Sequence, residues 1–413
     1  MEVDIDTNWQ KSNLIQSSNK FIKELRQIRK TEKDYDGIRI LCDNFYGKVI
    51  EMNKIVIAID NWNPYADIIF ISHAHTDHLP FFPKNAFSEL KINTKSPKII
   101  CSKITKEIGK FRTKGKFDFP EDLWLLGNDF DNKKDHISQT IEYKGLKISI
   151  IESGHAYGSL SLILEGNKKI LYTGDFNTED RFFDQNKTPI KGLNPIKCDF
   201  LIIECTFGTP RYCFPSFKNL QVELNQFVEK YVSEGNTIVL PAYIYGKSQI
   251  LLNTIKSSEK VLLSPEIAKI TQILENNDFK FTNWDSFGTL NKKDQAKKLK
   301  GSLIIVPSAV KFLEKFKKVL NAKYKIVVCS GKVLNESYRN EFPADTYYPL
   351  SDHCDFNRLI EFVQKCEPKE IFLEHGKIEE FSYYLSKTLK GSNIKHVPIN
   401  IFKSLDQNQF LIV

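Results

Sequence analysis

Three of the eight histidines of this chain lie within six residues, at the end of a short apolar run. The segment reads His73-Ala74-His75-Thr76-Asp77-His78. The run before it, residues 68–71, is typical of a buried strand. Imidazole and carboxylate are the ligands that borderline divalent metals prefer, and zinc above all. His73 and His75 can reach one ion from an extended backbone, whereas the adjacent Asp77 and His78 diverge and can reach a second. The alternative is an ordinary polar turn, but the spacing favours a two-metal site.

Three further polar residues follow strand-like runs elsewhere in the chain. His155 has Gly154 and Gly158 around it, and glycine lets the backbone approach closely. Asp175 follows one such run, and a carboxylate there can bridge two cations. His375 ends another run. Each of them could also be an ordinary loop residue, but their shared position at strand ends favours one site along the edge of packed sheets.

His353 has a different context, because Ser351 and Asp352 precede it and a helix is expected over residues 356–366. A histidine with a pKa near neutrality suits a general acid. The alternative is that Ser351 and Asp352 only cap the helix. Glu204 ends a strand-like run and is a candidate to orient His353, although acids at strand ends are common.

The segment Gly246-Lys247-Ser248 is similar to the end of a phosphate-binding loop, but Pro241 stands where that motif requires a glycine. Nucleotide binding through a P-loop is therefore not expected. A phosphate could still be held by the start of the helix expected here, together with Lys247.

The kind of secondary structure that must position these residues changes along the chain. Short strands dominate up to about residue 213, and strand and helix then alternate to about residue 343, which is typical of βαβ units with a parallel sheet. Ligand-type residues resume after that stretch, so we interpret it as an inserted domain. We expect strands over residues 68–71, 96–101, 141–152, 160–164, 169–172, 200–204, 237–242, 303–307 and 325–329. We expect helices over residues 103–111, 218–232, 246–255, 311–320 and 356–366.

The overall composition limits the class of protein. A chain of 413 residues exceeds what one core usually supports, which favours two domains. The net charge of +8 permits an acidic partner, and residues 292–325 hold eleven lysines against two acids, either as a solvated face or as a track for a phosphate backbone. The eight cysteines form no Cys-x-x-Cys pair, which argues against a disulfide framework and a zinc finger. No signal peptide or membrane-spanning run is evident, so we expect a soluble cytoplasmic protein.

Taken together, the candidate ligands resemble those of a metallo-β-lactamase-fold hydrolase. Glu204, His353 and His375 resemble the additional motifs of its β-CASP branch, which contains RNA 3′-end-processing endonucleases, RNase J and Artemis-type DNA repair nucleases. Finer matches are to the prokaryotic ligase-associated DNA exonuclease group, often labelled as mRNA 3′-end processing factors. They are Ile-Asp-Asn-Trp-Asn-Pro (59–64), Glu-Cys-Thr-Phe-Gly-Thr-Pro-Arg-Tyr (204–212), Ala-Tyr-Ile-Tyr-Gly-Lys-Ser-Gln (242–249) and Leu-Ser-Asp-His-Cys-Asp-Phe (350–356).

The resemblance implies an α/β fold, a metallo-β-lactamase αββα sandwich with an inserted β-CASP α/β cap. Residues 1–35 would be an N-terminal helical extension, 36–213 the first part of the metallo-β-lactamase domain, 214–345 the cap and 346–413 the return segment. Two departures stand out. Lys332 lies where the group tends to have tryptophan, and residues 1–35 have no counterpart in it.

The resemblance also implies two zinc ions, with manganese as a substitute. One zinc would be held by His73, His75, His155 and Asp175, and the other by Asp77, His78, Asp175 and His375. The implied catalytic residues are Asp77, His353 and Glu204, and the implied substrate-binding residues are Lys247, Ser330 and Ser351. Two cations that share Asp175 would activate a water, and His353, oriented by Glu204, would protonate the leaving oxygen.

The implied function is a two-zinc phosphodiesterase that acts as an exonuclease on single-stranded nucleic acid, of the DNA repair type. The nearest alternative is an RNA-processing β-CASP ribonuclease, because histidine at position 375 occurs in RNA enzymes and in the ligase-associated group alike. A small-molecule metallo-hydrolase and a metal-free binding subunit are further alternatives. The expected partner is single-stranded DNA or RNA, and a DNA ligase or a helicase is a candidate partner protein.

Overall fold

The computed structural model describes most of the chain. The described residues are 37–43, 47–63, 65–80, 97–125, 138–184, 186–257, 260–288, 299–308, 323–390 and 399–401. The expected N-terminal extension, the helix expected over residues 311–320 and most of the lysine-rich run lie outside them. No helix in these ranges is long and apolar enough to cross a membrane.

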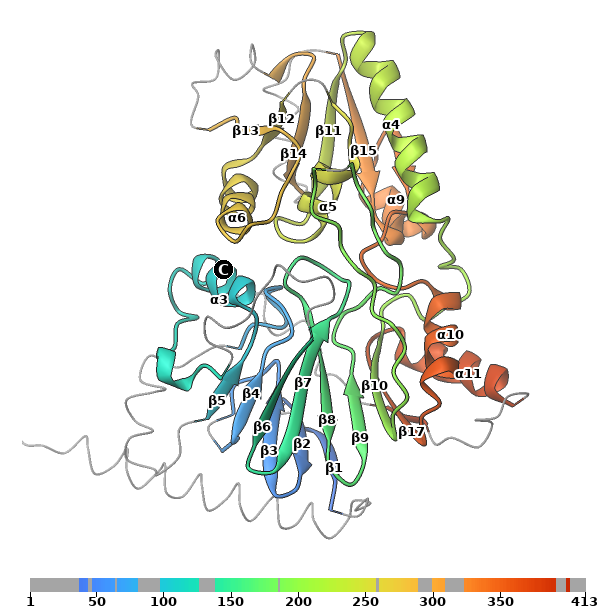
Figure 1. The fold of residues 1–413 in the computed structure, drawn as a ribbon. Helices are drawn as coiled ribbons and strands as arrows, with labels where there is room; N and C mark the ends of the chain where they lie inside the picture. The colour runs from blue at the N-terminus through green and yellow to red at the C-terminus, as the bar shows by residue number, and fades with distance from the viewer. Residues whose placement is uncertain are drawn as a thin grey trace, which may run out of the picture.

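Two sheets pack face to face (Figure 1). The five-stranded sheet has the order β1-β2-β3-β4-β5 and the seven-stranded sheet the order β18-β17-β10-β9-β8-β7-β6. The first consists of β1 (Arg39–Asp43), β2 (Gly47–Met52), β3 (Ile55–Ile59), β4 (Ile68–Phe70) and β5 (Lys98–Ile100). The second consists of β6 (Ser138–Tyr143), β7 (Leu146–Glu152), β8 (Leu160–Glu165), β9 (Lys169–Tyr172), β10 (Phe200–Cys205), β17 (Glu370–Gly376) and β18 (Ile399–Ile401).

Strand alternation explains how the seven-stranded sheet builds two cores, because successive side chains point to opposite faces. Ile202 and Tyr172 face the five-stranded sheet and share a core with Ile57 and Phe70. Leu201 and its neighbours on the other face pack against α10 (Phe356–Cys366) and α11 (Ile378–Leu389), which therefore cover the outer face of this sheet (Figure 1).

A third sheet is built from one continuous part of the chain, and the helices that follow its strands pack against it. Its six strands are all parallel, in the order β13-β12-β14-β11-β15-β16. They are β11 (Thr237–Ala242), β12 (Val261–Leu263), β13 (Trp284–Ser286), β14 (Leu303–Pro307), β15 (Tyr324–Cys329) and β16 (Thr346–Tyr348). Among the described residues, the helices of this part are α4 (Phe217–Ser233), α5 (Lys247–Thr254), α6 (Pro265–Glu275) and α9 (Glu336–Glu341). Because β16 pairs with β15, the sheet extends past the predicted boundary at residue 345.

Contacts of named residues join this third part to the other two sheets. Helix α3 (Lys103–Arg112), which follows β5, packs against α6, and Asn277 Nδ2 donates to Glu107 Oε2 at 3.0 Å. Tyr245 lies in the loop between β11 and α5, and its hydroxyl donates to the carbonyl of Tyr157 at 2.6 Å. The loop before α5 is thereby fixed close to the edge where the predicted ligands lie.

One predicted strand is wrong and several other elements were missed. Residues 141–152 are not one strand but a hairpin, in which β6 pairs with β7 and Tyr143 faces Leu146. Lys144 and Gly145 both have positive φ, 50° and 77°, as a two-residue hairpin turn requires. Strands β12, β13, β16 and β18 and helices α6, α9 and α11 were not predicted. The other predicted elements within the described ranges are found, to within a few residues at their ends.

Candidate metal centre

The predicted ligands lie at the carboxyl ends of neighbouring strands. The segment from His73 to His78 follows β4, His155 follows β7, Asp175 follows β9, and His375 lies near the end of β17. Strands β7, β9, β10 and β17 run in one direction within their sheet, so their carboxyl ends meet at one edge. Residues far apart in the sequence are brought together there.

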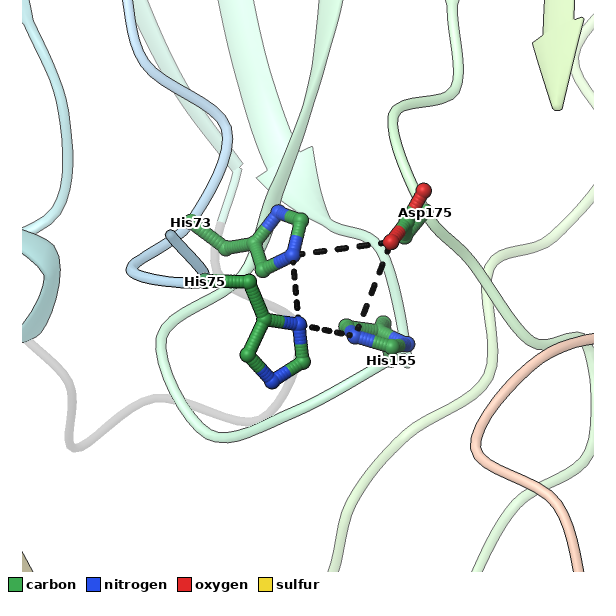
Figure 2. Close-up of side chains that lie close together, drawn as sticks. All are labelled: His73, His75, His155 and Asp175. Carbon is green, nitrogen blue, oxygen red and sulfur yellow. Dashed lines mark hydrogen bonds and ion pairs between the residues drawn. The ribbon is translucent and has the colours of Figure 1, made fainter. Parts of the chain in front are cut away.

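A first group of four side chains converges on one point (Figure 2). His73 Nε2 lies 2.9 Å from His75 Nδ1, and His75 Nδ1 lies 3.2 Å from His155 Nε2. Asp175 Oδ2 lies 3.5 Å from His73 Nε2 and 3.9 Å from His155 Nε2. Ligand atoms held tetrahedrally about 2.0–2.1 Å from a zinc ion are about 3.3–3.4 Å apart. The four observed separations bracket that value.

The hydrogen bonds on the outer side of each imidazole fix which nitrogen carries the proton. His75 Nε2 lies 3.1 Å from the carbonyl of Tyr245, and His155 Nδ1 lies 3.2 Å from the carbonyl of Asp352. A carbonyl only accepts, so both of these nitrogens donate. The Ser72 hydroxyl donates to Asp60 at 2.8 Å and can therefore only accept from His73 Nδ1, 3.0 Å away.

The inward-facing nitrogens of His73, His75 and His155 therefore carry no proton, and each presents a lone pair to the centre of the group. Burial lowers the pKa of each of these three side chains, which keeps them neutral. Three acceptors and a carboxylate that face one another repel unless a cation lies between them. The donor set therefore fits a divalent metal ion with nitrogen and oxygen ligands.

A second group consists of Asp77, His78 and His375, whose ligand atoms lie within 4.8 Å of one another. His78 Nε2 is 3.5 Å from Asp175 Oδ2 and 3.8 Å from Asp77 Oδ2. The other oxygen of Asp175, Oδ1, is buried and has no hydrogen-bond partner within the described part of the chain. The Oδ2 atom lies 3.5 Å from both His73 Nε2 and His78 Nε2, and a carboxylate placed between two ligand groups, with its second oxygen unpartnered, is suited to bridge two cations.

Strong negative potential surrounds the second group. His78 Nδ1 lies 2.8 Å from Asp60 Oδ2. Burial lowers the pKa of His78, but Asp175 and Asp60 outweigh burial and raise the pKa to about 10. The carboxylates that stabilise a proton on His78 would equally stabilise a metal ion at its Nε2.

His353 and Glu204 form a hydrogen-bonded pair beside the first group. His353 Nδ1 is 2.8 Å from Glu204 Oε1, and Glu204 is itself fixed by the backbone amides of Phe176 and Thr206 at 3.3 and 2.9 Å. Burial lowers the pKa of His353, but Glu204 outweighs burial and raises the pKa to about 9. The ring of His353 lies 4.5 Å from that of His155, centroid to centroid. A protonated imidazole is thus positioned next to the candidate metal ligands.

The alternative in which Ser351 and Asp352 cap the following helix is wrong. Helix α10 is capped by Asp355, whose carboxylate accepts from the amide of Arg358 at 2.8 Å. The Ser351 hydroxyl instead accepts from the amide of His353 at 3.0 Å. Ser351 therefore fixes the loop that presents His353.

The other two predicted substrate-binding residues lie in different surroundings. Lys247 is buried, and its ammonium group is 3.0 Å from Asp352 Oδ1 and 2.7 Å from the carbonyl of Leu350. It faces the protein interior rather than a substrate. Ser330 begins a short 3-10 helix (Gly331–Leu334), and its hydroxyl accepts from the amide of Lys332 at 3.2 Å.

Some residues of the site were not predicted from the sequence. Asp60 orients His78, and it follows the apolar strand β3, so the pattern that singled out Glu204 could have found it. Tyr172 donates to Asp60 Oδ2 at 2.9 Å, and Lys48 donates to the Tyr172 hydroxyl at 3.0 Å. No sequence pattern marks Tyr172 or Lys48, because their roles depend on how the two sheets face each other.

Comparisons with known proteins agree on the kind of fold. The family model described as Anti-Pycsar protein Apyc1 matches residues 53–231, less than half of the chain. A crystal structure described as a protein of unknown function from Enterococcus faecalis V583 superposes with a TM-score of 0.54 at 17% identity, covering 83% of this chain and 94% of that one. At that identity, the likeness concerns the fold alone.

Two named relatives match most of this chain. A protein of Opitutus terrae named "Probable DNA ligase" is 24% identical over 324 residues, which are 76% of this chain but only 27% of the relative. A protein of Methanocaldococcus jannaschii named "RNase J-like protein" is 24% identical over 383 residues, covering 78% of this chain and 85% of the relative. The chain therefore spans about a quarter of the first relative and most of the second.

Three findings indicate a class of metal-using hydrolases. They are the mixed α/β fold, the histidine and aspartate groups at the edge of two packed sheets, and the names of these relatives. The relatives indicate the β-CASP metallo-β-lactamase family. The prediction of a metal-dependent nuclease agrees with the names of its relatives.

Proposed function

We propose that this protein is a two-metal phosphodiesterase that degrades single-stranded nucleic acid, as an exonuclease of the DNA repair type. The observation that carries the proposal is the His353–Glu204 pair, 2.8 Å apart, beside two groups of candidate metal ligands. Hydrolysis of a phosphodiester needs stabilisation of negative charge and also a proton for a poor leaving group. These two arrangements supply both.

The first ion would be held by His73, His75, His155 and Asp175, and the second by Asp77, His78, His375 and the bridging Asp175. The nitrogen-rich donor set favours zinc, with manganese as a substitute. When bound, the two cations would supply an activated water and would neutralise charge on the phosphodiester.

His353 performs the proton transfer in this proposal. Its Nδ1–H is directed at Glu204, which leaves the proton on Nε2 for the leaving oxygen. As hydroxide adds to phosphorus and the bond to the leaving oxygen breaks, the proton moves from Nε2 to that oxygen, and the proton released when hydroxide formed from water restores Nε2 after the turnover. Glu204 keeps the ring in place and stabilises its charge throughout.

The αββα sandwich would carry this site, and the third sheet with its helices would form the inserted cap, which we extend to residue 348 because of β16. The loop after β11 presents Tyr243, which is 56% exposed, with its ring centroid 6.4 Å from that of His75. An exposed aromatic ring next to a phosphodiesterase site offers a stacking surface for a base of a single strand. This feature favours nucleic acid over a small molecule.

One relative favours DNA as the substrate and another favours RNA. The match to a chain named as a DNA ligase favours DNA repair and makes a ligase a candidate partner, with a helicase as another. The match to an RNase J-like protein over 85% of its length favours RNA processing as the second candidate function.

The test uses end-labelled single strands of DNA and RNA with the same sequence. We expect degradation of the DNA strand from one end, visible as a ladder with either the 5′ or the 3′ label, and its loss after treatment with a chelator. Degradation of the RNA strand alone would establish the second candidate instead. Failure to cut either strand, with two metal ions bound per chain, would refute the nuclease proposal.

A further inference from the structure

A lysine joins the two packed sheets directly behind the second ligand group. Lys48 lies on β2 of the five-stranded sheet, and its partners Glu374 and Tyr172 lie on β17 and β9 of the seven-stranded sheet. Its ammonium nitrogen is 2.8 Å from Glu374 Oε2 and 3.0 Å from the Tyr172 hydroxyl. The Lys48 side chain is only 23% exposed and that of Glu374 only 6%. Each of these two partners leads to a different candidate metal ligand.

The first connection leads to His375. Glu374 immediately precedes His375, whose backbone has a φ of 51°. The pairing of β10 with β17 also shifts register here, so that His375 lies at an irregularity of the sheet. A residue other than glycine remains in the left-handed region only where its surroundings hold it there. The ion pair of Lys48 with Glu374 fixes the residue next to this unusual backbone.

The second connection leads to His78. The Tyr172 hydroxyl accepts from Lys48, so its own hydrogen is free to be donated to Asp60 Oδ2, 2.9 Å away. The same carboxylate oxygen of Asp60 accepts from His78 Nδ1 at 2.8 Å. Lys48 therefore sets the direction of a hydrogen-bond chain that ends on His78 and leaves its Nε2 facing the metal position.

Lys48 also balances charge around the second group. Burial lowers the pKa of Lys48, but Glu374 and Asp60 outweigh burial and raise the pKa, so the side chain is a cation. Without it, the buried carboxylate of Glu374 would lose this counter-charge, and Asp60 would keep His78 as its partner. A buried carboxylate without its counter-charge reorients or admits water, and either change would move the imidazole next to it.

We propose that Lys48 is a positioning residue for the second metal ion, holding His78 and His375 in place through Tyr172, Asp60 and Glu374. The inference rests on the proposed two-metal function but not on the choice of substrate. The first ion depends on other supports, since His75 and His155 are oriented by the carbonyls of Tyr245 and Asp352. His73 touches the Lys48 network through Ser72, and the shared ligand Asp175 approaches it at His78 Nε2, 3.5 Å away.

The test compares metal binding by the full-length chain and by Lys48→Met, which removes the ammonium group and keeps a long side chain. The matched control is Lys147→Met, because Lys147 lies on β7 with 53% exposure and pairs with Glu165 at 3.4 Å, away from the site. Metal-free proteins are titrated with Zn²⁺ in a calorimeter and with Co²⁺ while the visible spectrum is recorded. We expect two equivalents per chain in the wild type and the control. In Lys48→Met the first equivalent should bind as before and the second at least ten-fold more weakly.

Two further variants keep the test decisive if Lys48→Met does not fold. Tyr172→Phe breaks only the connection to His78, and Lys48→Arg keeps the charge, so we expect a weakened second equivalent in the former and recovery of most of its affinity in the latter. Two equivalents of wild-type affinity in Lys48→Met, or in Tyr172→Phe if only that variant folds, would overturn the inference. A wild-type chain that binds fewer than two equivalents would instead refute the two-metal function itself.

Discussion

Replacing His353 by glutamine tests the assignment of the general acid. The amide retains much of the volume of the imidazole but has no proton to deliver to a leaving oxygen. General acid catalysis contributes about 10²- to 10⁴-fold in rate, or about 3–5 kcal/mol of transition-state stabilisation. Because His353 is not among the ligands of either group, metal content should be unchanged. We therefore expect His353→Gln to bind two ions and to cleave a dinucleotide about 10²- to 10⁴-fold more slowly.

The leaving group separates this role from a merely structural one. A nucleotide hydroxyl is a poor leaving group that needs a proton, whereas p-nitrophenolate leaves without one. The variant should therefore lose far less activity on a nucleoside p-nitrophenyl phosphate than on the dinucleotide, with kcat measured for both. Equal losses on the two substrates would refute the reasoning, since they would place His353 in the site without a role in proton transfer.

Glu204→Gln should impair the same proton transfer, but less severely than His353→Gln. The His353–Glu204 hydrogen bond, at 2.8 Å, involves a charged acceptor, and such bonds contribute about 1.5–3 kcal/mol. Its loss should slow cleavage of the dinucleotide roughly 10- to 150-fold, by the same conversion of about 1.4 kcal/mol per tenfold. As with His353→Gln, the p-nitrophenyl ester should be less affected than the dinucleotide.

Three other predictions follow from the same contacts. Lys247→Met breaks a buried ion pair with Asp352, so we expect a loss of about 3–5 kcal/mol in stability and a lower kcat, whereas a rise in KM alone would indicate that Lys247 contacts substrate. Tyr243→Ala should raise the Kd for single strands roughly 5- to 150-fold, since stacking of a base contributes about 1–3 kcal/mol, and Tyr243→Trp should retain binding; filter binding measures the Kd of both variants. Burial raises the pKa of Glu152 to about 7 from its ordinary 4.5, against a smaller opposing effect of Lys191. The folded state thus favours the neutral acid, and stability falls as pH rises from about 4.5 to 7. Glu152→Gln should therefore increase the free energy of unfolding at pH 8 by up to about 3 kcal/mol, measured as a higher melting temperature. At pH 4 the melting temperature should be nearly unchanged.

The candidate ligands could be found from the sequence because each one ends a strand. An apolar run followed by histidine or aspartate is a local pattern, and parallel strands bring such ends to one edge without further information. Thus His155, Asp175 and His375 could each be singled out, although their sharing of one site rested on the resemblance to a known family. The hairpin at residues 138–152 was missed although a local signal marks it. Apolar residues occupy odd positions before the turn, Ile141 and Tyr143, and even positions after it, Leu146, Ile148 and Ile150, because the paired residues 143 and 146 share one face.

The residues behind the ligands could not be found in this way. Lys48 and Tyr172 are 124 residues apart and meet only because the two sheets face each other. Lys247 has the sequence context of a phosphate-binding lysine, yet packing buries its ammonium group against Asp352. A local pattern states which groups are present at a strand end or a helix start, but the direction in which a long side chain points depends on packing.

Two lysines behind the ligands, the partly buried Lys48 and the buried Lys247, explain how carboxylates can orient the histidines of the site while metal ions are still bound by other acids. Lys48 neutralises the acids behind His78 and His375, and Lys247 neutralises Asp352, whose carbonyl orients His155. An acid left without a counter-charge would compete for the same cations or bind protons, as buried carboxylates do. With the outer acids paired, the free negative charge is concentrated on Asp175 and Asp77, where the proposed ions would bind.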